Sequence, residues 1–148
     1  MIPWPGIVAF VVALAAGVCI GISVLGGWAE LARFYRHHGR FNGRRDRFES
    51  LRMGQVHYNL CAVLGMNSDG LFLSVMLPFR LWHPPLLIPW RELSLEWKKS
   101  SFFKLPYLDV RARQVPACSI RIYAGSFARL LVESASQHMP AASATQSY

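Results

Sequence analysis

The dominant feature of the sequence is a long apolar run over residues 7–28. The run contains no Lys, Arg, Asp or Glu, and its polar side chains are those of Cys19, Ser23 and Trp28. At about 1.5 Å of rise per residue, a helix over this run measures roughly 33 Å, enough to cross a hydrocarbon core of about 30 Å. We therefore predict one transmembrane helix over residues 7–28.

Small residues recur at every fourth position along this predicted helix. They are Ala9, Ala13, Gly17 and Gly21, and the last two form a G-x-x-x-G step. Residues four apart lie on one side of a helix, and small side chains there allow a second helix to approach closely. The row therefore predicts packing against an integral membrane partner. The alternative is that Gly and Ala are simply frequent in membrane-spanning helices.

The distribution of charge predicts an orientation. All 16 Lys and Arg residues follow the apolar run, whereas residues 1–6 contribute only the α-amino group. Because positive residues favour the cytoplasmic side, we expect the N-terminus outside and the C-terminal domain in the cytoplasm. A cleaved signal peptide would have a positive start, a shorter apolar run and a small-residue cleavage site. The sequence therefore favours an uncleaved anchor.

Aromatic and basic side chains flank the predicted helix. Trp4 and Trp28 stand near its two ends, where indole rings favour the membrane interface. Residues 29–48 form a basic juxtamembrane segment, and its arginines are predicted to face the headgroups: Arg33, Arg36, Arg40, Arg44, Arg45 and Arg47. The alternative is that these charges only fix the topology.

Residues 49–136 have the periodicity of one small β domain. Alternating apolar positions predict a hairpin with strands at 55–64 and 71–77, joined by a turn-rich segment. Further strands are expected at 86–90, 93–98, 102–105, 107–113 and 119–123, followed by an amphipathic helix with Ser126 as its N-cap. The fold class is thus α+β: a transmembrane helix, an antiparallel curved sheet or barrel, and a C-terminal capping helix. Residues 137–148 are expected to form a flexible tail.

Two stretches resemble the core of bacterial PH-like and GRAM-like domains. They are residues 67–74, with the sequence NSDGLFLS, and residues 88–93, with the sequence IPWREL. In those families a D-G-L strand precedes an I-P-W-x-E strand, and a terminal helix plugs the sheet. The resemblance covers roughly residues 50–135, and the Pro-rich insert between the motifs departs from the shortest members. It implies a fold and not an activity, because such domains bind lipids, bind proteins or serve as scaffolds.

The sequence shows no recognisable catalytic or metal-binding constellation. It has no Ser/His/Asp or Cys/His arrangement, no phosphate-binding glycine loop and no H-E-x-x-H motif, and the cysteines Cys19, Cys61 and Cys118 lack ligand spacing. His37 and His38 could ligate a metal or pigment only with partners from elsewhere. We therefore predict a protein that is not an enzyme, has no metal or cofactor, and binds neither nucleic acid nor a small-molecule substrate.

A Pro-rich loop before residue 86 contains large apolar side chains with few places to be buried. Exposed apolar patches tend to mark partner or membrane contacts, so four residues are predicted to make them: Phe79, Trp82, Pro84 and Pro85. For Trp82, folding back on its own sheet is an equal alternative.

Together these patterns favour a non-catalytic accessory or assembly subunit of a larger membrane complex, such as a respiratory or photosynthetic one. We expect it in the bacterial inner membrane, with the helix packed on partner helices and the β domain bracing the cytoplasmic face. The alternative is a membrane-tethered PH-like module that binds anionic lipid headgroups through the basic segment, Arg111 and Arg113. An already anchored protein gains little affinity from one more headgroup contact.

Overall fold

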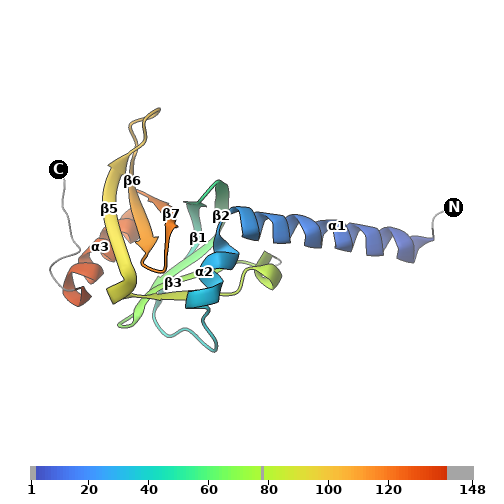
Figure 1. The fold of residues 1–148 in the computed structure, drawn as a ribbon, viewed down its shortest axis with the longest axis horizontal. Helices are drawn as coiled ribbons and strands as arrows, with labels where there is room; N and C mark the ends of the chain where they lie inside the picture. Colours follow the sequence, from blue (N-terminus) through green and yellow to red (C-terminus); the bar gives the residue numbers. More distant parts are fainter. Residues whose placement is uncertain (1–2, 78, 140–148) are drawn as a thin grey trace.

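A long helix stands out from a small α+β domain (Figure 1). The computed structural model describes residues 3–77 and 79–139. Helix α1 spans Trp4–Leu25, helix α2 spans Trp28–Tyr35, and helix α3 spans Ser126–His138 after seven strands. The α+β class with an N-terminal apolar helix and a C-terminal helix is confirmed. The predicted tail falls partly in α3, and its residues 140–148 lie outside the described residues.

Two glycines divide the N-terminal helical region where one continuous helix was predicted. Gly26 ends α1, and Gly27 has a φ of +79°, a left-handed conformation that favours glycine. A Cβ at Gly27 would also lie 2.8 Å from the Cys118 Sγ atom. The chain therefore changes direction between α1 and α2.

The strands form one seven-stranded antiparallel sheet with the order β4-β3-β2-β1-β7-β6-β5. Their bounds are β1 Arg44–Met53, β2 Val56–Met66, β3 Gly70–Val75, β4 Leu86–Pro89, β5 Leu93–Lys99, β6 Pro106–Ala112 and β7 Val115–Tyr123. Two short 3₁₀ helices, η1 at Phe79–Trp82 and η2 at Trp90–Glu92, flank β4. The predicted hairpin is confirmed as β2 and β3, and β4 is an edge strand, as its proline requires.

Three sequence predictions within the domain are wrong. The first half of β1 was assigned to a separate basic segment, whereas it pairs with β2 from Arg44 onward. Residues 102–105 form the turn between β5 and β6 and not a strand. The N-cap of α3 is Gly125, and no side chain caps that helix.

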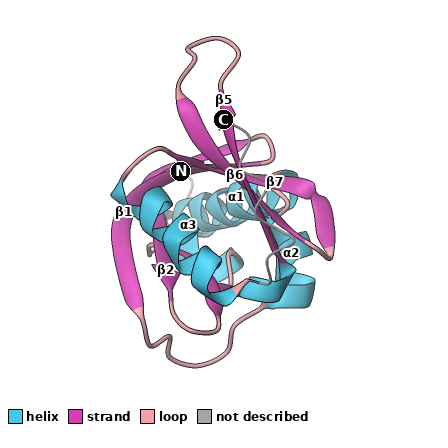
Figure 2. Ribbon diagram, turned by 90° about the vertical axis from the view of Figure 1, so that its left-hand side faces the viewer, coloured by secondary structure: helices cyan, strands magenta, loops and turns pink. Residues whose placement is uncertain are grey.

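The core lies between the curved sheet and the helices α2 and α3. Leu108, Val110, Ile120 and Ile122 project inward from β6 and β7, and α3 contributes Phe127 and Leu131 to the same buried cluster. Figures 1 and 2 show α3 and α1 at opposite ends of the domain. One face of α3 therefore packs on the sheet, whereas α1 extends away from it.

The two stretches that carry the family resemblance meet at one corner of the sheet. Gly70 pairs with Pro89 between β3 and β4, and a Cβ at Gly70 would overlap the Ile88 carbonyl. The buried Trp90 indole donates a hydrogen bond of 2.9 Å to the Asn67 carbonyl oxygen. The glycine and the tryptophan thus have structural roles at this corner.

Candidate interaction surfaces

Helix α1 is apolar on all sides and is hardly covered by the rest of the chain. It is 22 residues long, and only 6% of its most apolar stretch is buried. Of the described helices, it is the one that is long and apolar enough to cross a membrane. Large side chains such as Phe10, Val12 and Leu14 are exposed along it.

The predicted row of small residues is open to contact. Ala9, Ala13 and Gly17 are exposed, and a Cβ added at Gly17 or Gly21 would meet nothing within 4 Å. Gly26 is buried against the domain and lies about half a turn around the helix from Gly17, at about 100° per residue. The row therefore faces away from the side on which the chain packs against itself.

A cluster of three aromatic rings joins α1 and α2 to the domain; we call Trp28, Tyr58 and His83 the junction cluster. The Trp28 ring centroid lies 5.6 Å from that of Tyr58 and 5.3 Å from that of His83. The fully buried Trp28 indole donates a hydrogen bond of 2.9 Å to the Pro84 carbonyl oxygen. The structure thus differs from the prediction that Trp28 sits free at a membrane interface, because the domain core encloses its ring.

His83 is held as the neutral tautomer with the proton on Nδ1. The Phe79 carbonyl oxygen, 3.0 Å from Nδ1, can only accept a hydrogen bond. Nε2 therefore accepts one from the Tyr58 hydroxyl at 3.2 Å. Burial lowers the pKa of His83 and raises that of Tyr58, so both side chains are neutral near pH 7.

The junction leaves no room for larger residues. A Cβ added at Gly54, in the β1–β2 turn, would lie 3.1 Å from the Gly26 carbonyl oxygen. The Cys118 thiol donates to that same oxygen at 3.6 Å, and burial raises its pKa to about 11. The thiol is thus protonated and packs as an apolar group.

The Pro-rich loop has two faces, and only one is exposed. Trp82, Pro84 and Pro85 are half-buried, and the Pro84 carbonyl oxygen is the acceptor for Trp28. The η1 helix contacts α1, and Phe79 and Leu81 are exposed there. The sequence analysis predicted that this loop makes external contacts, but it did not separate the residues that pack on the domain from those that are exposed.

The arginines predicted to lie beside the membrane divide into two groups. Arg33 and Arg36 are exposed on or just after α2, and Arg40 is exposed in the loop between α2 and β1. Arg44, Arg45 and Arg47 lie in the first half of β1, whose other end approaches Gly26. At about 3.3 Å per residue, the length of β1 places Arg44 up to roughly 30 Å from that end. Residues 29–48 are therefore built into the domain, and the structure does not bring the six arginines together.

The turn between β5 and β6 is a protruding apolar tip, where the sequence analysis predicted a strand. Phe102 is 87% exposed, and Phe103 and Leu105 are also exposed. Figures 1 and 2 both show this hairpin extending beyond the sheet. The pair Ser100-Ser101 before these residues and Pro106 after them were the available signal that regular strand structure is interrupted here.

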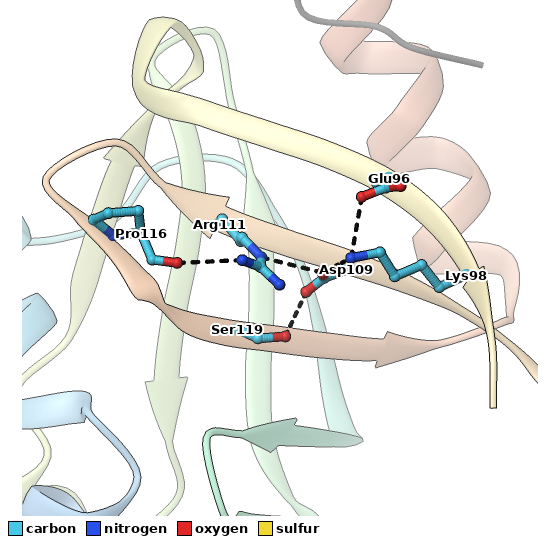
Figure 3. A network of polar contacts seen from close by, with 6 residues as sticks. All are labelled: Glu96, Lys98, Asp109, Arg111, Pro116 and Ser119. Atoms are coloured by element: carbon cyan, nitrogen blue, oxygen red, sulfur yellow. Dashed lines mark hydrogen bonds and ion pairs between the residues drawn. The ribbon is translucent and has the colours of Figure 1, made fainter. Parts of the chain in front are cut away.

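A polar cluster lies on the sheet face opposite α3. Its members are Lys98, Asp109, Arg111 and Ser119, and we call it the ion cluster (Figure 3). The buried Asp109 carboxylate accepts hydrogen bonds from Lys98 at 2.6 Å, from Arg111 at 3.2 Å and from the Ser119 hydroxyl. Burial by itself raises the pKa of Asp109, but the hydrogen bonds from Lys98 and Ser119 and the nearby cations lower it below its usual value. Arg111 is thus already paired and is not a free headgroup ligand.

An open groove of about 430 Å³ lies beside α2, between residues 34–37 and β4. At its wall the Tyr35 hydroxyl donates a hydrogen bond of 2.6 Å to Glu92 and accepts one from the Gln114 amide. Burial and this carboxylate raise the pKa of Tyr35 to about 12. The pair fastens α2 to the domain and provides no activated nucleophile.

Within the described ranges, no three His, Cys, Asp or Glu side chains are grouped to hold a metal ion. Cys19, Cys61 and Cys118 are free thiols. Comparison of the chain with protein-family models, curated proteins and solved structures finds no match.

Proposed function

We propose that this protein is a non-catalytic accessory subunit of a membrane protein complex. In this proposal α1 spans the membrane, its small-residue row packs on a partner helix, and the β domain braces the complex on the cytoplasmic side. The observation that supports it best is the near-complete exposure of α1 on a domain whose core is already closed by α2 and α3. So large an apolar surface requires a cover of lipid and protein.

The construction of the junction supports a retained anchor over a removable leader. Trp28 and Leu31, directly after α1, are fully buried in the domain core. Cleavage at the end of α1 would leave Gly54 and Cys118 without the Gly26 backbone against which they pack. Because residues on both sides of this point pack together in the core, cleavage there would disrupt the folded domain.

The open row on α1 supports a helix partner. A Cβ added at Gly17 or Gly21 would meet nothing within 4 Å, so both positions have room for a partner helix. Close packing of backbones over small residues drives helix association in lipid, where the hydrophobic effect between helices is absent. The charge asymmetry supports a cytoplasmic domain, because every Lys and Arg residue follows α1.

The domain supports a scaffold function of the PH-like kind. The single antiparallel sheet followed by a capping helix is what the resemblance implies, and the D-G-L and I-P-W stretches pack against each other. The headgroup-binding alternative has less support, because Arg44, Arg45 and Arg47 lie far from α1 and Arg111 is paired with Asp109.

The row can be tested by adding bulk to it. With Gly17→Ile and Gly21→Ile combined, we expect co-purification of partner proteins from native membranes in mild detergent to fall at least tenfold, which corresponds to about 1.4 kcal/mol. The measurement is quantitative mass spectrometry of a pull-down.

The matched control combines Val11→Ile and Ala15→Ile, two exposed positions that are also four apart but lie well around the helix from the row. We expect it to keep its partners. Undiminished recovery of partners with the glycine variant, or wild-type protein recovered without partners, would contradict the proposal.

A further inference from the structure

The residues just before and within η1 form an exposed apolar ridge beside the end of α1. Leu77 is 74% exposed, Phe79 43% and Leu81 73%, and Val24 and Leu25 of α1 are exposed as well. Figure 1 shows η1 alongside the end of α1 that is nearest the sheet, and the two helices are in contact. The ridge therefore extends the apolar surface of α1 sideways.

Hydrogen bonds to the backbone of this loop hold the ridge side chains in their exposed positions. His83 donates to the Phe79 carbonyl oxygen at 3.0 Å, and the Arg80 carbonyl oxygen accepts the His83 amide at 3.3 Å. Trp28 holds the next residue, Pro84, through its carbonyl oxygen. The junction cluster thus fixes the inner side of the loop and turns its leucines outward.

We propose that the η1 ridge inserts into the lipid leaflet from which α1 emerges. The inference rests on the proposed function, because it requires that α1 spans the membrane. With the axis of α1 along the membrane normal, the contact with η1 places Phe79 and Leu81 at the depth of the last turn of α1, which is the boundary between acyl chains and headgroups.

Lipid is the occupant that the chemistry of the ridge favours. The ridge is continuous with Val24 and Leu25, so one apolar medium covers both surfaces. The exposed Arg80 lies between Phe79 and Leu81, where its guanidinium can reach headgroup phosphates while the apolar neighbours enter the acyl region. Apolar side chains on one side with a cation among them are typical of helices that lie in the interface.

The domain is thereby attached to the membrane at two points. The spanning helix α1 fixes its position, and the ridge beside it prevents the domain from tilting toward the opposite side. Transfer of the exposed leucine and phenylalanine side chains of the ridge from water to the acyl region favours the orientation in which they are inserted.

The test measures the depth of single fluorophores on the full-length protein. The native thiols are removed as Cys19→Ala, Cys61→Ala and Cys118→Ala, and an environment-sensitive probe is attached to Leu81→Cys. The protein is reconstituted in vesicles of phosphatidylcholine and phosphatidylglycerol. Quenching is compared between lipids that carry a nitroxide just below the headgroup and iodide in the water.

Two further probe positions make the outcomes distinguishable. Val12→Cys reports on the middle of α1, and Phe102→Cys reports on the hairpin tip, which is far from α1 in Figure 1. We expect the probe at position 81 to lose most of its emission to the nitroxide lipid and little to iodide, with a stronger lipid effect than at position 102.

Lipid quenching at position 81 that is no stronger than at position 102, with position 12 still quenched by lipid nitroxides, would overturn the ridge and leave the spanning helix intact. Shielding of position 81 from both quenchers would mean that protein covers it, and this would also overturn the inference. Iodide access at position 12 would overturn the spanning helix itself, and with it the proposed function.

Discussion

The junction cluster and the ion cluster both contain a buried ionisable side chain, but they keep it in opposite protonation states. Each contains a titratable side chain that is almost completely buried: His83, beside Tyr58, in the first and Asp109 in the second. His83 is kept neutral by burial among aromatic rings, whereas Asp109 is kept charged by Lys98 and Ser119. Burial alone therefore decides the protonation state of His83, whereas the cations and the hydroxyl beside Asp109 outweigh burial there.

The two clusters also differ in what they hold together. The junction cluster joins segments more than 50 residues apart in sequence, as the bond between Trp28 and Pro84 shows. The ion cluster joins three neighbouring strands that already share a ladder of backbone hydrogen bonds. Loss of the junction cluster should therefore be the costlier of the two.

The largest effect is expected for Trp28→Ala. Removal of a fully buried tryptophan leaves a cavity and costs about 3–5 kcal/mol of unfolding free energy. Urea unfolding of the full chain in mild detergent, followed by circular dichroism, measures it. Trp97→Ala is the control, because that indole is 37% exposed, and we expect a clearly smaller loss. Equal losses for both variants would contradict the central position of the junction cluster.

A smaller effect is expected for Asp109→Ala in the ion cluster. The variant removes three charge-assisted hydrogen bonds, but Lys98 and Arg111 stay in contact with water, so we expect a loss of about 2–3 kcal/mol. The matched control is Glu96→Ala, whose half-exposed carboxylate also pairs with Lys98 and should contribute less than about 1 kcal/mol. A Glu96 loss as large as that of Asp109 would show that Asp109 is not the centre of the cluster.

The smallest effect is a pH dependence that separates the clusters. Because burial lowers the pKa of His83 below its usual 6.5, the unfolded chain binds the proton first. The contribution of His83 to stability is therefore complete above about pH 6.5 and declines as the pH falls toward the lowered pKa. The contribution of Asp109 has the same sign, but it is lost only below the usual carboxyl value of 3.8.

Unfolding titrations between pH 8 and pH 5, chosen from those usual values, isolate the histidine. His83→Asn keeps an amide donor near the Nδ1 position but does not titrate, so its stability should fall less over this range than that of the wild type. Asp109→Ala should follow the wild-type slope there. Parallel curves for the His83 variant and the wild type would contradict the assignment.

Local patterns predicted the elements that local chemistry determines. The predicted hairpin of β2 and β3 and the predicted C-terminal amphipathic helix are confirmed, with Phe127 and Leu131 of α3 buried, and the proline of β4 agrees with its place at the sheet edge. Each depends on periodicity or on the missing amide of proline, which a sequence displays directly.

The sequence analysis failed where the structure depends on residues far apart in sequence or on irregular backbone. β1 contains register shifts on either side of Glu49, and Phe48 has a φ of +60° and points to solvent, so the period of two is broken. Trp28 looked like a membrane anchor because its partners Tyr58 and His83 lie far along the chain. The hairpin tip at Phe102 resembled a strand because apolar residues alone do not indicate whether a sheet is present to cover them.

The left-handed glycine at position 27 and the buried tryptophan that follows it make the link between α1 and the domain a fixed elbow. Rotation of α1 about its own axis therefore turns the whole sheet with it. Under the proposed function, a partner helix packed on the row from Ala9 to Gly21 would select one rotation of α1. That rotation would also set the direction in which the β5–β6 hairpin points along the membrane surface.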